Sequence, residues 1–361
     1  MPASKSPSPV DADDDGVYAN PYIDSDMRGH PDLLRVLFPD PLARDLPYLS
    51  FILYKTDLYD HAVQRWSHSP TDGEQDSVAA FLHRISEAIA VAYKAPSAYH
   101  WIQSSKSPVA TLMSKEYIEP GYYRRACYVH ASGDFEADLR SLVKNVRWEN
   151  YNFDNRRFVI GLIFDGDSLY VVHHDRGGRI VSIPINYHKD PGFLVRVLLS
   201  LMHGSDHRLG YDPSFFFDKK TEKCMITCDH KDYEVIEKVY NSQDLYGPCC
   251  VVWRVRRDGK DYIIKDVWSD AAFAEMKMMG KLAGVEGIAQ LVAFDVPRTD
   301  ELAGTSTSQY RLDYFDLDDE RYELVISRTQ TRMVISPIGD DMEHFKSMKE
   351  FIGLFIDTIK G

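Results

Sequence analysis

The fold of the second half of the chain is decided by residues 259–268, GKDYIIKDVW. The aromatic and β-branched run 262–264 predicts a strand, and the Asp258-Gly259 dipeptide in front of it predicts a tight turn. Lys265 stands at the end of this run. Because burying an ammonium group is costly unless an anion meets it, Lys265 is expected to face water, a carboxylate of its own chain or a phosphate.

The composition is that of a folded, acidic protein. The length of 361 residues suggests two domains or slightly more, and a hydrophobic content of 44% is enough for real cores. The formal net charge of −13 should repel nucleic acid and anionic membranes, so neither is an expected partner. No apolar run approaches the roughly 18 residues of a membrane helix, and the first 16 residues lack the apolar core of a secretory signal. We therefore expect an intracellular protein, in the cytoplasm or the nucleus.

No metal site or disulfide framework is predicted. The five cysteines are an odd number and are scattered along the chain. Cys224, Cys228 and His230 are close in sequence, but KCMITC alternates like a strand and no second pair of ligands follows. The run 173–175, HHD, leads into a glycine turn, and its two histidines should point to opposite faces of a strand.

The first half of the chain predicts a disordered tail and one α+β domain. Residues 1–25 are rich in Ser, Pro and Asp, which is typical of disorder. The domain is expected to span 26–232, with helices followed by an antiparallel sheet and a covering helix. Turn dipeptides at Asp165-Gly166 and Gly177-Gly178 predict a three-stranded meander. The expected helices lie within 30–39, 45–66, 74–95, 134–148 and 190–202, the last with Asp190 as N-cap and Pro191 in its first turn.

A different order of elements begins near residue 233. Three strands fill 233–268, a helix 270–283, further strands 288–296, 321–327 and 332–336, and a final helix 345–361. Three strands, a helix and two more strands is the order of a protein-kinase small lobe. In that lobe the lysine of the third strand pairs with ATP phosphates and with a glutamate of the next helix. Lys265 and Glu275 stand at these two positions.

Several segments also resemble the fungal-type protein kinases. They are 156–186, 190–202 and 209–217 ahead of the lobe, YIIKDVW at 262–268, and RMVISPIG at 332–339 followed by 345–361. The resemblance implies phosphorylation of protein hydroxyls with Mg-ATP, with Lys265 as the phosphate lysine and Glu275 as its partner. It also implies that 233–361 is a small lobe with the leading helix of an incomplete large lobe. Residues 336–339, including Ser336 and Ile338, would be the hinge whose backbone holds the adenine edge.

The sequence departs from the family pattern at the phosphate loop. A working loop needs several glycines so that its backbone can close over phosphates, but LYGPCCVVWRV at 245–255 offers only Gly247. Pro248 removes a backbone donor, and the two cysteines after it add bulk. The side chain expected to cap the adenine is Val252 or Val255.

The catalytic loop is the larger departure. The chain contains no HRD or DFG sequence, which would supply the base and the magnesium ligands, and it ends about where the family's catalytic loop would begin. We therefore expect that this polypeptide alone does not transfer phosphate. The alternative is a pseudokinase or protein-interaction module that acts through its first domain. A nuclease, suggested only by an analogy of fold, would need clustered carboxylates that strand 123–132 does not carry.

Overall fold

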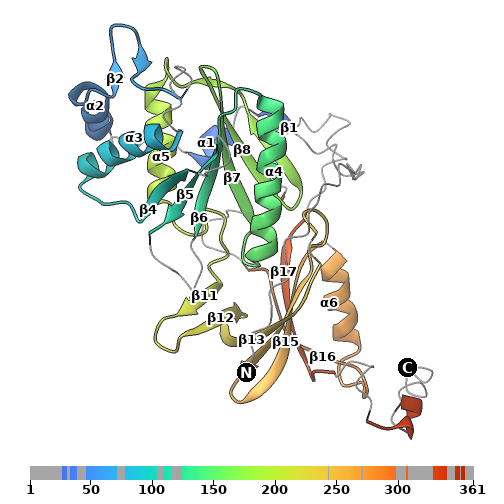
Figure 1. The fold of residues 1–361 in the computed structure, drawn as a ribbon. Helices are drawn as coiled ribbons and strands as arrows, with labels where there is room; N and C mark the ends of the chain where they lie inside the picture. Colours follow the sequence, from blue (N-terminus) through green and yellow to red (C-terminus); the bar gives the residue numbers. More distant parts are fainter. Residues whose placement is uncertain are drawn as a thin grey trace.

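The computed structural model describes residues 27–30, 33–38, 46–70, 78–103, 109–115, 124–242, 244–269, 271–297, 306–307, 328–339, 346–349 and 351–353. These residues form two large sheets, one above the other in Figure 1, with helices packed on each. No helix in this part of the chain is long and apolar enough to cross a membrane. The α+β class expected from the sequence is confirmed.

The first sheet has eight strands in the order β1-β9-β8-β7-β6-β5-β4, with β10 also paired to β8. The predicted meander is confirmed, because β7, β8 and β9 pair antiparallel and Gly166 and Gly178 take positive φ at the two turns. The strands are β1 (Met27–His30), β4 (Tyr99–Gln103), β5 (Val109–Ser114), β6 (Arg125–His130), β7 (Phe158–Asp165), β8 (Ser168–Asp175), β9 (Gly178–Ser182) and β10 (Ile185–Asn186).

The sequence predicts an antiparallel sheet, but two of the strand pairs in this sheet are parallel. β6 pairs parallel to β7, and β1 pairs parallel to β9. The first of these follows from α4 (Phe135–Asn152), which connects β6 to β7. A crossover helix carries the chain back to the end of the sheet at which the first strand began, so the two strands that it joins run in the same direction.

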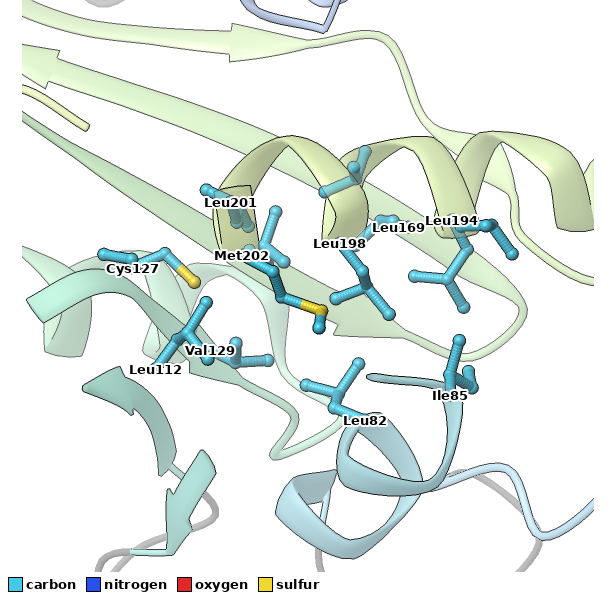
Figure 2. Close-up of a cluster of buried hydrophobic side chains, with 14 of the residues drawn as sticks. Leu82, Ile85, Leu112, Cys127, Val129, Leu169, Leu194, Leu198, Leu201 and Met202 are labelled. Atoms are coloured by element: carbon cyan, nitrogen blue, oxygen red, sulfur yellow. The ribbon is translucent and has the colours of Figure 1, made fainter. Parts of the chain in front are cut away.

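Helices cover both faces of the first sheet (Figure 1). α3 (Val78–Tyr93) and α5 (Pro191–His203) pack with α2 (Leu46–Lys55) on one face, and α4 packs on the other. In Figure 2, Leu82 of α3 and Leu198 of α5 point into the core beside Val129 of β6. α5 begins as predicted, since the Asp190 side chain accepts a hydrogen bond from the backbone N–H of Phe193. α1 (Leu33–Leu37) is the remaining helix in the described part of this domain.

The helix expected over 45–66 ends early. α2 stops at Lys55, and the rest forms a small hairpin of β2 (Tyr59–Asp60) and β3 (Arg65–Trp66). The Asp60 carboxylate accepts hydrogen bonds from the backbone N–H groups of Ala62 and Val63. An aspartate that binds backbone groups just ahead of it stabilises a turn in competition with a helix.

The second sheet has seven antiparallel strands in the order β11-β12-β13-β14-β15-β17-β16. The predicted order of three strands, a helix and two strands is present, and β17, the last strand among the described residues, lies between β15 and β16. The predicted strand 321–327 lies outside the described residues, whereas 348–349 and 351–353 of the predicted final helix are helical. The elements are β11 (Phe215–Asp218), β12 (Lys223–Cys228), β13 (Lys231–Asn241), β14 (Val251–Arg257), β15 (Lys260–Trp268), α6 (Ala271–Lys281), β16 (Gln290–Asp295) and β17 (Gln330–Ser336).

The second sheet begins earlier in the sequence than residue 233. β11 and β12 fall inside the range 26–232 expected for the first domain, yet they pair with β13. The sheet is curved so that β12 meets the far strands: Arg332 of β17 donates from Nη1 to the carbonyl oxygen of Thr227 at 2.8 Å. Its core includes Trp253, Val255 and Ile264. Sheet membership therefore places the change of architecture at about Phe215.

We predict that Gly161→Ala lowers the free energy of unfolding by about 1–3 kcal/mol, because overpacking strains a filled core. A Cβ atom at Gly161 of β7 would collide with the side chain of Leu142 on α4. Urea unfolding measures the effect. Gly280→Ala in α6 is the control, since its Cβ would meet nothing within 4 Å and a helical glycine-to-alanine change should stabilise. Equal stability of Gly161→Ala and the unchanged chain would contradict this close packing of α4.

Candidate functional site

The centre of the candidate site is an ion pair between β15 and α6. Lys265 Nζ lies 2.7 Å from Glu275 Oε1 and 3.0 Å from Glu275 Oε2. The two side chains are 27% and 34% exposed, so the pair is half-buried and still reachable from solvent. The carboxylate that the sequence predicted to meet Lys265 is therefore in place. An ammonium held in this way is fixed in position and keeps donors available for a second anion.

Strand pairing defines which side chains surround Lys265. In the sheet, Lys265 stands directly opposite Val252 of β14 and Met333 of β17. Residues opposite one another on neighbouring strands point to the same face. Met333 is fully buried on that face, and Val252 is half-buried beside the lysine. Lys265 thus lies between two apolar side chains and a carboxylate.

Val255 does not belong to this surface. Its position on β14 is three residues from Val252, an odd number, so its side chain points to the opposite face of the sheet. There it is 0% exposed and packs in the second core. Of the two valines that the sequence offered as an adenine cap, only Val252 shares a face with Lys265.

The predicted hinge leaves the sheet beside the amino-terminal half of β15. Ser336 is the last residue of β17, and its neighbour Ile335 stands opposite Ile263, two residues before Lys265 and on the same face. Ser336 is buried, whereas Ile338 is half-buried beyond the end of the strand. The stretch 336–339 therefore borders the Lys265 face, as a segment that presents backbone groups to a planar base would have to.

The connection between β13 and β14 forms the opposite border. Gly247 has φ +103°, a conformation that side chains rarely adopt, and Cys249 has φ +43°. Pro248 accepts a hydrogen bond through its carbonyl oxygen from the backbone N–H of Trp268 at 2.7 Å. Cys250 is close enough to Lys265 for the ammonium to act on its thiol, whose pKa burial nevertheless raises. The predicted Gly247 thus lies in a loop beside Lys265.

The model of the family described as fungal protein kinase matches residues 126–361, which is more than half of the chain. The chain belongs to the fungal protein kinase family. The match begins in β6, so it spans most of the first sheet as well as the second. No curated protein matches the chain. No solved structure matches it either.

A buried charge cluster lies behind the kinase-like face, and sequence reasoning missed it. Asp266 follows Lys265 on β15 and points to the opposite face, where it binds Arg332 of β17 through two hydrogen bonds of 2.7 and 2.6 Å. Arg332 Nη2 also lies 3.1 Å from Asp212 Oδ2. Arg157, directly before β7, reaches Asp212 Oδ1 at 3.0 Å. The cluster, completed by Gln330, joins the first sheet to the strands that carry the site.

The cluster is neutral in sum, because two arginines meet two aspartates. Arg157, Asp212 and Arg332 are each at most 2% exposed. Burial alone would raise the pKa of the Asp212 carboxyl, but Arg157 and Arg332 lower that pKa to about 2. Asp212 is therefore ionised in the folded protein at neutral pH. Since Asp266 is engaged by Arg332 on the far face, it is not available to a metal ion beside Lys265.

The other candidate ligands are also placed apart. His173 packs against Phe158 at a ring distance of 4.7 Å, and the next residue, His174, contacts Tyr246. Within the described ranges, no group of three His, Cys, Asp or Glu side chains is arranged to hold a metal ion.

We predict that Asp212→Asn lowers the free energy of unfolding at pH 7 by about 3–5 kcal/mol, because it leaves two buried arginines short of one anion. The folded-state pKa of Asp212 lies below its ordinary value, so its contribution is present above about pH 4 and is lost as pH falls towards 2. Urea unfolding between pH 7 and pH 3 should therefore show a flatter acid dependence for the variant.

Asp261→Asn is the matched control. Arg256 and Arg254 hold the pKa of Asp261 at about 2 as well, but that carboxylate lies at the surface. Exposed ion pairs contribute little to stability, so this variant should unfold almost like the unchanged protein at pH 7. An equally small effect of Asp212→Asn would show that the buried cluster does not hold the two sheets together.

Proposed function

We propose that this chain binds an adenine nucleotide on the Lys265 face of the second sheet. The observation that carries the proposal is the Lys265–Glu275 ion pair, held between the third strand and the following helix of a kinase-like order of elements. In this family the pair would place an ammonium beside the phosphates of Mg-ATP. The purine would lie between Val252 and the backbone of 336–339.

Phosphate transfer to protein hydroxyls is the reaction that family membership implies. We propose that these 361 residues do not perform it alone, because their sequence contains no HRD or DFG element to supply a base and magnesium ligands. Mg²⁺ would then reach this chain chiefly through the nucleotide. A protein substrate, or a protein partner, would complete the functional unit.

A second candidate is a pseudokinase or interaction module. Pro248 favours it, since this residue removes one backbone donor from the connection that would approach the phosphates. In that case the first domain would carry the function and the Lys265 face would be only structural. Nucleotide binding separates the two readings.

We predict that Mg-ATP raises the melting temperature of the unchanged protein and that Lys265→Ala weakens its binding at least about tenfold, because the fixed cation is lost. Isothermal titration calorimetry of the full chain measures the affinity. Lys260→Ala is the matched control, since Lys260 lies on the same strand, is exposed and extends over the Tyr262 ring. Its affinity should equal that of the unchanged protein.

Two results would go against nucleotide binding at this face. One is an unchanged melting temperature in saturating ATP, with and without Mg²⁺. The other is an affinity that Lys265→Ala and Lys260→Ala leave alike, because the nucleotide would then occupy a different site. Partner capture that persists without nucleotide and survives Lys265→Ala would support the interaction module.

A further inference from the structure

The connection between β13 and β14 is fastened to the first domain. Leu245 is only 7% exposed. It packs in the core that α4 forms with the first sheet, a core that includes Val109 and Tyr128. The connection thus gives an apolar side chain to the core of another domain, although its two ends belong to the second sheet. A loop that is free to close over a ligand would not bury a leucine in this way.

The next residue makes the most specific contact. Tyr246 stacks on His174 of β8, with ring centroids 5.5 Å apart and an angle of 18° between the planes. The Tyr246 hydroxyl lies 3.0 Å from His174 Nε2, within hydrogen-bond distance. Arg176, two residues further along the first domain, donates from Nη1 to the carbonyl oxygen of Asp244 at 3.3 Å.

The strand that leads into the connection is held to the first domain as well. Asp154 accepts hydrogen bonds from Lys238 Nζ at 3.1 Å and from Asn241 Nδ2 at 2.9 Å, near the end of β13. Across the base of the connection, the carbonyl oxygen of Cys250 accepts a hydrogen bond from the backbone N–H of Ser242 at 2.9 Å. The loop base is therefore closed at the sheet while its middle is held by the first domain.

We propose that Tyr246 and His174 are positioning residues for the nucleotide site, and that the first domain holds the β13–β14 connection in order beside Lys265 before any nucleotide binds. The inference rests on the proposed nucleotide site. A glycine-rich loop can adapt its backbone to the phosphates as they arrive, but this loop has one glycine and a proline. Contacts from the first domain take over the ordering, and preorganisation reduces the entropy lost on binding.

Cys249 reports the state of the loop without any nucleotide. Its side chain is 4% exposed, and burial raises the pKa of its thiol, so it should react slowly with iodoacetamide while the loop is held. Cys127, fully buried between the first sheet and its helices, reports global unfolding in the same sample. Mass spectrometry of the labelled peptides assigns the modification to each cysteine.

The experiment compares the full chain with Tyr246→Ala and Tyr246→Phe. Release of the loop in Tyr246→Ala should raise the Cys249 labelling rate about tenfold and leave Cys127 unchanged. Binding of Mg-ATP should weaken about fivefold, whereas adenosine, which has no phosphates beside the loop, should change by less than about twofold. Tyr246→Phe keeps the ring and loses only the hydroxyl, so it should fall between the two.

Tyr54→Ala is the matched control, because it removes another tyrosine–histidine stack, that of the exposed Tyr54 of α2 on His61, and should alter neither readout. His174→Ala, combined with Tyr246→Ala, should add nothing to the labelling of Tyr246→Ala if the two rings act as one contact. The His174→Ala substitution removes the same contact from the side of the first domain, at a residue remote in sequence from Lys265.

Cys249 labelling equal to that of the unchanged chain would overturn the proposal, as would labelling that rises only together with Cys127. A released loop with unaltered Mg-ATP affinity would also overturn it, since the loop would then not belong to the site. If the unchanged chain binds no nucleotide, the proposed function and the role of Tyr246 at that site fall together. Cys249 labelling still decides in that case whether the first domain orders the loop.

Discussion

Everything near the candidate site depends on the placement of Arg332 between two buried aspartates. Its guanidinium bridges Asp266 of the second sheet and Asp212 of the connection that leads into that sheet. Arg157 brings the first sheet to the same point. A cluster of this kind is costly to assemble because four charges leave water, but removing any one member strands an uncompensated charge. The relative position of the two sheets is therefore narrowly defined.

β15 links this cluster to the Lys265 face because successive side chains of a strand point to opposite faces of the sheet. Lys265 points to α6 and Asp266, the next residue, points into the cluster. A shift of register by one residue would exchange the two side chains, placing the lysine beside Arg332 and the aspartate beside Glu275. Both contacts would become repulsive. The electrostatics of the two faces thus fix the register of the strand that carries the nucleotide lysine.

Local patterns explain why much of the fold could be predicted and part of the site could not. The helix at 190–202 follows from its cap and apolar periodicity, and the Lys265–Glu275 pair joins residues only ten positions apart. Asp212 and Arg332 are 120 residues apart, and each reads in sequence as an ordinary polar residue. No periodicity relates them. Val255 was misplaced for a different reason: two valines three residues apart look alike until strand register assigns their faces.

The first domain is accordingly part of the architecture of the site rather than an appendage to it. It supplies Arg157 to the cluster behind Lys265 and the pocket of side chains that receives Leu245 in front. Loss of Arg157 would leave Asp212 with one arginine instead of two. Loss of the side chains around Leu245 would expose that leucine and free the loop. Both effects converge on β14 and β15. The family match, which starts in β6 of the first sheet, includes Arg157, Leu245 and most of the side chains around that leucine, whereas Val109 of β5 lies ahead of it.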